Sequence, residues 1–210
     1  MTSVILDLDG TLVDSVPLHV VCWHDAFVAA GTPVPTNKLH AAIGLGSTRL
    51  VRHVLGTMPS ADLEQQAIDS HSQLFAGRSD SLQPTPGATA LLQDLADRAV
   101  SFVVATAAGS KERDRLLAIL DDPDVDVVDN DDTADSKPAA GPLRAAMAKL
   151  DVRPGLDVTM VGDSPWDGYA AGQAGVRFLG VRCGGFADAT LLRAGATLLA
   201  QDPAGVIGLL

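Results

Sequence analysis

The chain has 210 residues, 47% of them hydrophobic, which is enough for one large domain or for a domain carrying a smaller insertion. Lysines and arginines number 15 against 26 aspartates and glutamates, and the resulting net charge of −11 argues against nucleic acid or an anionic membrane as partner. The two cysteines show no pairing pattern, which suits a reducing compartment. No signal-peptide pattern and no membrane-length apolar run is present, so we expect a cytoplasmic protein with no evident protein partner.

Short β-branched runs alternate with longer stretches of helical periodicity. This pattern predicts strands at 3–6, 100–106, 125–128, 158–162 and 176–181, with helices at 87–98, 110–120, 139–150 and 167–175. The alternation is typical of an α/β fold with a doubly wound parallel sheet, a Rossmann-like core. In such sheets ligands bind beyond the carboxyl ends of the strands.

Residues 16–81 interrupt this alternation. They contain no convincing strand, and helical patterns occupy 17–31, 47–55 and 61–77 before the proline-rich connector "LQPTPG". We therefore predict an α-helical cap at 16–81, inserted after the first strand into a catalytic core formed by 1–15 and 82–210.

Four polar segments fall at or just after the ends of predicted strands: "DLDGT", "ATAAGS", "DSKPAAG" and "GDSPWD". Each alone has an ordinary explanation. Asp-x-Asp-Gly often forms a turn, Thr106 could cap a helix, and Lys137 could be a solvated loop residue. Together, however, they place two carboxylate clusters, a hydroxyl group and a lysine along one edge of one sheet, which turns alone do not explain.

Carboxylates gathered in this way suit Mg²⁺, which prefers hard oxygen ligands and keeps several waters. Asp7 and Asp163 can supply carboxylates to the ion, Asp9 its backbone carbonyl, and Asp167 lies behind them. These four residues are the candidate metal ligands, and Mg²⁺ is the expected cofactor.

The same residue set suits phosphoryl transfer. A carboxylate can attack phosphorus and form an aspartyl phosphate, which divides one difficult displacement into two easier ones. Thr106 and Lys137 would hold the phosphoryl oxygens, assisted by backbone N–H groups around Ala107. Gly10, in the turn after the first strand, completes the candidate phosphate-binding residues.

These motifs, from residue 4 to about residue 200, resemble the haloacid dehalogenase-like hydrolase superfamily. The cap after "DLDGT" resembles that of the phosphoglycolate phosphatase and β-phosphoglucomutase branch. The resemblance implies that Asp7 is the nucleophile and Asp9 the general acid and base. The second motif departs from many relatives, which carry a small polar residue where this chain has Ala107 and Ala108, so leaving-group contacts there are not implied.

The cap contains weaker signals. "GLGST" followed by Arg49 resembles the substrate-facing cap loop of this branch, where a basic residue can meet a second anionic group, although the segment is equally typical of a helix start. His19 and Trp23 lie one helical turn apart near the first linker. They could face the cleft, but packing is the more common role for such residues.

The function expected from these residues is a Mg²⁺-dependent phosphatase that hydrolyses a small phosphorylated metabolite through an aspartyl phosphate. A β-phosphoglucomutase-like sugar phosphomutase, using the same residues, is the alternative. A phospho-acceptor receiver domain also carries aspartates and a lysine at strand ends, but the inserted helices and the chain length disfavour it. A catalytically silent binding protein is a further reading, disfavoured because no catalytic position has been lost.

Overall fold

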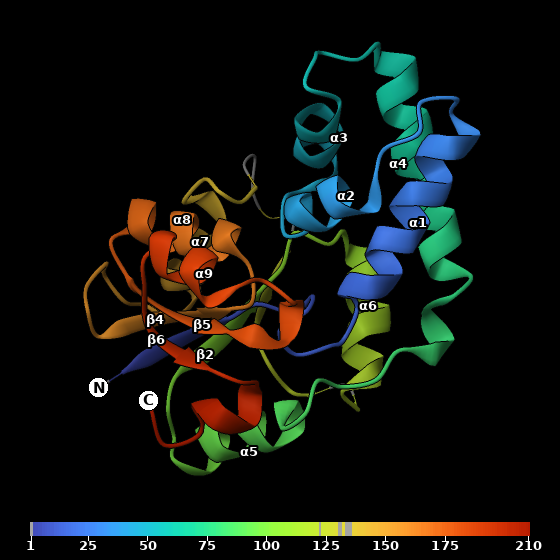
Figure 1. The fold of residues 1–210 in the computed structure, drawn as a ribbon. Helices are drawn as coiled ribbons and strands as arrows, with labels where there is room; N and C mark the ends of the chain where they lie inside the picture. The colour runs from blue at the N-terminus through green and yellow to red at the C-terminus, as the bar shows by residue number, and fades with distance from the viewer. Residues whose placement is uncertain (1, 122, 130–131, 133–135) are drawn as a thin grey trace.

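The computed structural model describes residues 2–121, 123–129, 132 and 136–210. Its centre is a six-stranded sheet of order β3-β2-β1-β4-β5-β6, in which every neighbouring pair is parallel. The strands are β1 Ser3–Leu6, β2 Phe102–Ala105, β3 Val127–Val128, β4 Val158–Gly162, β5 Arg177–Val181 and β6 Ala196–Ala200. The predicted doubly wound α/β fold is confirmed (Figure 1).

Helices cover both faces of the sheet. They are α5 Ala88–Asp97, α6 Ser110–Ile119, α7 Gly141–Lys149, α8 Pro165–Ala174 and α9 Asp188–Arg193, with short 3₁₀ turns at Ser79–Ser81, Arg182–Gly184 and Pro203–Val206. Val4 and Leu6 of β1 pack with α5 and α6, whereas Ile5 packs with α7, α8 and α9. Successive strand residues point to opposite faces, so this apolar run holds two hydrophobic layers together.

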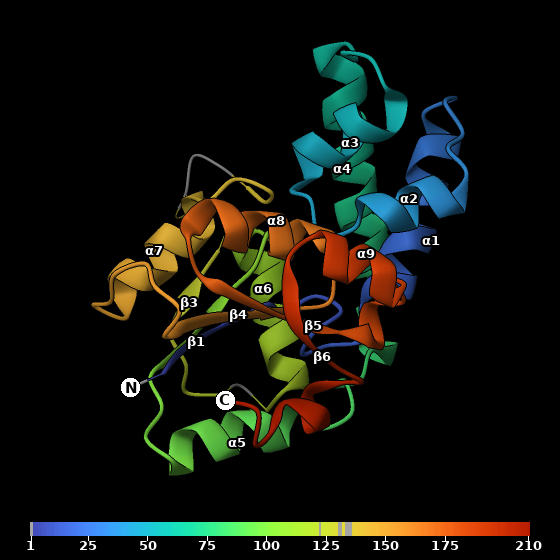
Figure 2. The ribbon, with the colours of Figure 1, turned by 60° about the vertical axis from the view of Figure 1, so that its left-hand side comes forward.

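The helices that follow β1 form a group of their own: α1 Val16–Ala29, α2 Thr36–Ala42, α3 Ser47–Leu55 and α4 Ala61–Ala76. They stand over the carboxyl edge of the sheet and pack around a separate apolar cluster that includes Trp23, Phe27 and Leu50 (Figures 1 and 2). We call residues 16–81 the cap. Helical segments in this position are consistent with the predicted cap, and its exact division from the core stays a prediction.

The two chain segments that join cap and core run side by side. The amide of Asp14 donates to the carbonyl of Gln83 over 3.0 Å, and the amide of Thr85 donates to the carbonyl of Leu12 over 2.9 Å. Trp166 of α8 adds a third link, because its Nε1 donates to the carbonyl of Ala41 in α2 over 3.1 Å. Trp166 therefore joins the core to the cap.

Several predicted elements need correction. The second strand runs over 102–105 instead of 100–106, and the third over 127–128 instead of 125–128. Three helices or strands were not predicted: α2 and α9, which have only seven and six residues, and β6, a five-residue strand at the sheet edge. Among the helices that the structure describes, none has the length and apolar character needed to cross a membrane.

Candidate active site

Four predicted site residues meet at one edge of the sheet. Asp7 follows β1, Thr106 follows β2 and Asp163 follows β4, so the parallel strands bring all three to their carboxyl ends. Lys137 reaches the same place from the loop before α7. All four side chains are buried, although three are ionisable. Burial of this kind is costly unless the groups interact with one another.

The Lys137 ammonium lies between two carboxylates. Its Nζ donates to Asp7 Oδ1, lies 2.7 Å from Asp167 Oδ1 and also donates to the carbonyl of Ala105 over 3.3 Å. The solvated-loop reading of this lysine is therefore wrong. Opposite it, Thr11 Oγ1 lies 3.0 Å from Asp163 Oδ1 and 3.4 Å from Asp7 Oδ2, so this hydroxyl connects the two acids.

Carboxylates outnumber the cation in this cluster. Oxygens of Asp7, Asp163 and Asp167 all lie within 4.8 Å of one another, with one lysine among them. Burial raises the pKa of Asp7 to about 7, the Lys137 charge opposes the rise, and the charge of Asp167 adds to it. Burial, together with the charges of Asp7 and Asp167, also raises the pKa of Asp163 well above its usual range.

These residues fit a divalent cation. Three carboxylate oxygens gathered this closely are hard ligands of the kind that Mg²⁺ prefers, and the positive ion would offset the charge that the single lysine leaves uncompensated. Asp167 is held in place by a capping box: its Oδ2 accepts from the amide of Ser164 over 3.1 Å and from Ser164 Oγ over 2.6 Å. The site therefore has a preformed cluster of acidic ligands.

Two glycines allow the backbone to approach Asp163. Gly10 has φ +78°, and a Cβ there would lie 2.5 Å from Asp163 Oδ2. A Cβ on Gly184 would lie only 1.7 Å from the same oxygen. Gly10 was predicted from its motif, whereas Gly184 was not, because it is distant in sequence from every motif.

Asp9 points away from the carboxylate cluster and into a hydrogen-bonded chain. Its Oδ1 accepts from Ser15 Oγ over 2.8 Å and lies 2.9 Å from His19 Nε2, while Oδ2 accepts from Thr106 Oγ1 over 3.2 Å. His19 Nδ1 lies 3.1 Å from His71 Nε2, so the chain continues into the cap. As a candidate metal ligand, Asp9 is therefore limited to its backbone carbonyl in this conformation.

The protonation states along this chain follow from its charges. Burial opposes a charge on His19, but the hydrogen bond and the charge of Asp9 outweigh it and raise the pKa of His19. Burial and the charge of His19 lower the pKa of His71 well below its usual range. Burial would raise the pKa of Asp9, but hydrogen bonds from His19, Ser15 and Thr106 lower it instead. A protonated His19 thus donates to an ionised Asp9 and to a neutral His71, an assignment that satisfies every bond in the chain.

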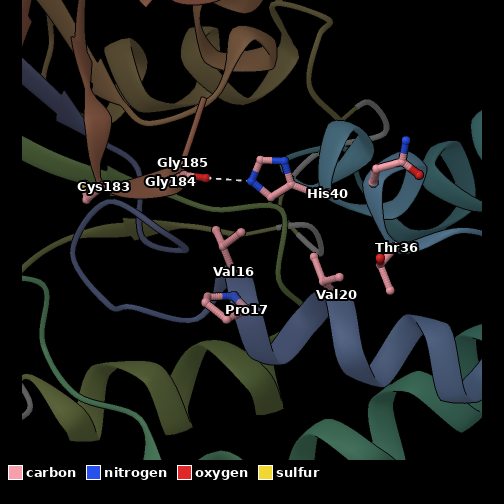
Figure 3. Close-up of a pocket in the computed structure, with 9 residues that line it drawn as sticks. Val16, Pro17, Val20, Thr36, His40, Cys183, Gly184 and Gly185 are labelled. Atoms are coloured by element: carbon pink, nitrogen blue, oxygen red, sulfur yellow. Dashed lines mark hydrogen bonds between the residues drawn. The ribbon is translucent and has the colours of Figure 1, made fainter. Parts of the chain in front are cut away.

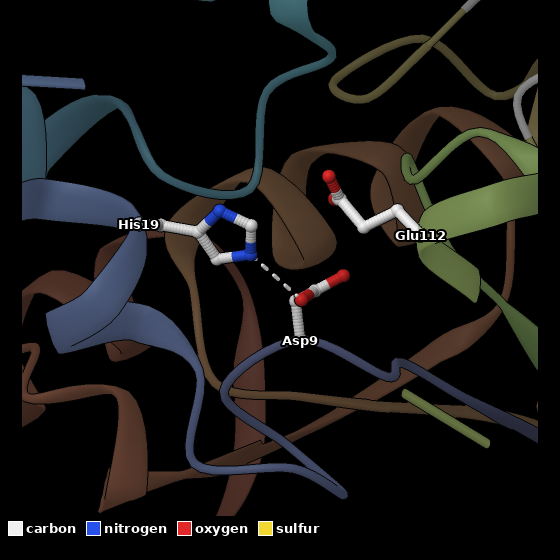
Figure 4. Close-up of side chains that lie close together, drawn as sticks. All are labelled: Asp9, His19 and Glu112. Carbon is white, nitrogen blue, oxygen red and sulfur yellow. Dashed lines mark hydrogen bonds and ion pairs between the residues drawn. The ribbon is translucent and has the colours of Figure 1, made fainter. Parts of the chain in front are cut away.

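A small cavity of about 50 Å³ lies above Asp7 and Asp9, bounded by the cap loop at 43–45, by Ala107 and Ala108, and by Lys137. Glu112, from the first turns of α6, points into the same space as Asp9 and His19 (Figure 4). Burial raises the pKa of Glu112 to about 7, with the charge of His19 opposing that rise and the charge of Asp9 adding to it. An acidic side chain therefore faces a space expected to hold an anion.

A larger cavity of about 640 Å³ adjoins the small one and extends outward between the cap and α6. Ser47, Ala107, Ala108 and Glu112 line both cavities, so the two form one continuous site. Arg49, a predicted substrate contact, has an exposed side chain on α3 and lies outside the residues that line either cavity.

A third hollow, of about 560 Å³, lies on another side of the cap–core boundary, between α1, α2 and the turn at 182–185 (Figure 3). His40 Nε2 donates to the carbonyl of Gly184 across its edge over 2.9 Å. The walls include Val16, Val20 and Cys183, and burial raises the pKa of that thiol, which keeps it protonated. This hollow lacks the charged groups of the Asp7 site, so we assign the chemistry to the latter.

Sequence reasoning missed Thr11, His71 and Glu112 as site residues, and it favoured packing for His19. Thr11 lies within "DLDGT", so its place in the motif was an available signal. His71 and Glu112 carry no local signal, because only the fold brings α4 and α6 beside Asp9.

Comparison with known proteins identifies the family. The sequence profile of the haloacid dehalogenase-like hydrolases matches residues 1–175. This chain belongs to that family. The profile ends before β5, whereas the predicted resemblance extended to about residue 200. Because the match includes Asp7, Asp9, Thr106, Lys137 and Asp163, the family assignment and the geometry concern the same residues.

Curated relatives and solved structures agree with this assignment. A phosphoglycolate phosphatase of Rhodospirillum rubrum is 33% identical over 83% of this chain and 76% of that protein. An N-acetylmuramic acid 6-phosphate phosphatase of Pseudomonas putida is 28% identical over 88% of this chain and 84% of that protein. The crystal structure of a Pseudomonas syringae hydrolase superimposes with a TM-score of 0.96 at 27% identity, covering 100% of this chain and 97% of that one.

Proposed function

We propose that the protein is a Mg²⁺-dependent phosphatase that hydrolyses a small phosphorylated metabolite through an aspartyl phosphate on Asp7. The observation that carries the proposal is the position of Asp7, whose carboxylate lies between Lys137, Thr11 and two further acids beneath a small cavity. The relatives named as phosphatases support the same reaction class.

Asp7, Asp163 and Asp167, with the backbone carbonyl of Asp9, are the residues proposed to hold the metal. When bound, Mg²⁺ would neutralise charge on the phosphoryl oxygens and on the attacking carboxylate. Lys137 remains beside Asp7 and would neutralise part of the same charge, and Thr106 would donate to the phosphoryl group when its bond to Asp9 is released.

In the first step, one Asp7 oxygen bonds to phosphorus as the bond from phosphorus to the leaving-group oxygen breaks. That oxygen takes a proton from Asp9, which must therefore enter this step protonated. His19 donates to Asp9 over 2.9 Å, and proton transfer along this bond would supply the acid form.

In the second step, a water molecule attacks phosphorus and releases inorganic phosphate and free Asp7. Asp9, left ionised after the first step, accepts the proton of that water. The lowered pKa of Asp9 supports this role, because hydrogen bonds with His19, Ser15 and Thr106 favour its ionised form.

The test is release of inorganic phosphate from p-nitrophenyl phosphate and from a panel of phosphorylated sugars, nucleotides and short acids with Mg²⁺ present. We expect steady turnover that EDTA abolishes and that Asp7→Asn reduces to background. Turnover by Asp7→Asn within about tenfold of the parent, ~1.4 kcal/mol in barrier height, would refute the nucleophile assignment. Conversion of β-glucose 1-phosphate to glucose 6-phosphate much faster than phosphate release would instead identify a mutase.

A further inference from the structure

Glu112 lies where a substrate's leaving group must pass. The small cavity above Asp7 has room for little more than a phosphoryl group, and the larger cavity adjoins it at Glu112, which lines both. Its carboxylate shares one space with Asp9 and His19 (Figure 4). A group bonded to the ester oxygen, which Asp9 must reach, would therefore lie against Glu112.

The charged groups that line the small cavity do not favour an anionic leaving group. Of the two cations that line the small cavity, Lys137 is paired with Asp7 and Asp167, and His19 with Asp9. Glu112 adds a negative group at a part-buried position, where screening by solvent is weaker than at the surface. A carboxylate carried close to the ester oxygen would meet this side chain.

The larger cavity, which we call the outer cavity, offers hydrogen bonds in place of charge pairing. Its walls include the hydroxyl and amide side chains of Thr48, Ser72, Gln73 and Ser136. Lys111 and Arg115 line it as well, but both side chains are exposed. The positive charges of Lys111 and Arg115 also disfavour a cationic group on the substrate in this cavity. A neutral, hydroxylated leaving group is therefore the best match.

We propose that Glu112 is a specificity-determining residue that selects phosphate esters with a neutral, hydroxyl-bearing leaving group and disfavours those with a carboxylate next to the ester carbon. A hydroxyl of a polyol or sugar would donate to the Glu112 carboxylate, whereas a carboxylate there has no proton to donate and is repelled. The inference rests on the proposed phosphatase function. It separates this chain from relatives named as phosphoglycolate phosphatases, whose named substrate carries a carboxylate at that position.

The test uses two substrates that differ at one group. Glycerol 2-phosphate and 2-phosphoglycerate share a three-carbon chain with the phosphate on the central carbon, and a hydroxymethyl group next to the ester carbon in the first replaces the carboxylate of the second. Values of kcat/KM are compared with Mg²⁺ at about pH 8, where a carboxyl group is ionised. We expect the parent protein to prefer glycerol 2-phosphate by at least about tenfold in kcat/KM, ~1.4 kcal/mol.

Glu112→Gln keeps the shape of the side chain and removes its charge. We expect this variant to narrow the preference for glycerol 2-phosphate at least about fivefold, ~1 kcal/mol, chiefly by raising kcat/KM for 2-phosphoglycerate. The matched control is Asp114→Asn, which removes one negative charge from the exposed side of the same helix and should leave the ratio unchanged. Binding of both compounds to Asp7→Asn, with and without Glu112→Gln, gives a second readout that does not depend on turnover.

The outcomes distinguish the two proposals. If p-nitrophenyl phosphate and both esters resist hydrolysis, the phosphatase function and this inference fail together. If esters are hydrolysed but the parent prefers 2-phosphoglycerate, or Glu112→Gln and Asp114→Asn shift the ratio equally, the function stands and the role of Glu112 is refuted.

Discussion

Lys137 Nζ lies 2.7 Å from Asp167 Oδ1, and both side chains are at most 2% exposed. The same ammonium contacts Asp7, so one cation separates the proposed nucleophile from a proposed metal ligand. Burial opposes the charge of this lysine, but the charges of Asp167 and Asp7 outweigh burial and raise the pKa of Lys137. Lys137 thus stabilises the acidic site before any metal or substrate binds.

Replacing Lys137 with Met should therefore affect folding as well as turnover. Loss of the cation leaves buried carboxylates without a partner, and breaking a buried pair in this way costs about 3–5 kcal/mol of unfolding free energy. The measurement is urea unfolding in EDTA, with Lys38→Met, at an exposed position on α2, as the control. A loss below about 1 kcal/mol would show that Asp7 and Asp167 are already neutral in the metal-free protein.

Metal affinity should depend on pH through Asp7. Its pKa of about 7 in the folded, metal-free protein means that Asp7 keeps a proton which the unfolded chain has already lost. The proton that Asp7 keeps therefore stabilises the folded protein at low pH, and this stabilisation is lost as the pH rises to about 7. Below about pH 7 the ion must displace that proton, so Kd for Mg²⁺ should rise by about tenfold for each unit by which the pH falls. Calorimetry from pH 5 to 8 tests this, and a flat profile would exclude proton displacement.

Asp9→Asn should affect substrates according to their leaving group. A sugar or glycerol alkoxide needs a proton as it departs, whereas p-nitrophenolate leaves without one. Single-turnover rates should fall by about 10²–10⁴-fold for the first kind and less for the second. Asp14→Asn, at a nearby exposed position, should leave both rates unchanged. Equal losses with both substrates would count against Asp9 as the general acid.

The cap loop should be sensitive to a single added methyl group. Gly44 has φ +99°, and a Cβ there would lie 2.7 Å from Ser164 Oγ and 3.0 Å from Trp166 Cδ1. Gly44→Ala should lift this loop from the core and lower kcat/KM by about tenfold or more, because misplacing a substrate-enclosing segment is costly. Gly56→Ala provides a matched control, since its φ is +67° with nothing within 4 Å. Both glycines have a positive φ, so an equal loss of activity in both variants would assign the effect to backbone strain and not to the contacts of Gly44.

Sequence reasoning predicted the fold and the core of the site because both follow local patterns. Five of the strands are apolar runs, and polar residues at the ends of parallel strands must meet at one edge. The edge strand β6 was missed because it is short and neither alternates regularly between buried and exposed residues nor is buried throughout. The cap helix α2 was missed because it is only seven residues long.

The surroundings of Asp9 could not be predicted from local patterns. His19, His71 and Glu112 lie on three different helices, and each also fits the amphipathic pattern of its own helix. Only the packing of α1 against α4, and the approach of α6 to the cap, places these side chains around one carboxylate. Arg49 shows the opposite case, since a motif suggested contact with substrate but the structure places its side chain on the exposed side of α3.

The central claim is that Asp7 becomes phosphorylated. The most direct measurement is rapid acid quenching during turnover with Mg²⁺, followed by reduction with sodium borodeuteride, which converts an aspartyl phosphate into deuterated homoserine, and mass spectrometry of the peptide that contains residue 7. We predict deuterated homoserine at position 7, dependent on substrate and absent from Asp7→Asn. Deuterated homoserine at another aspartate, or an unmodified Asp7 peptide while phosphate is being released, would contradict the account.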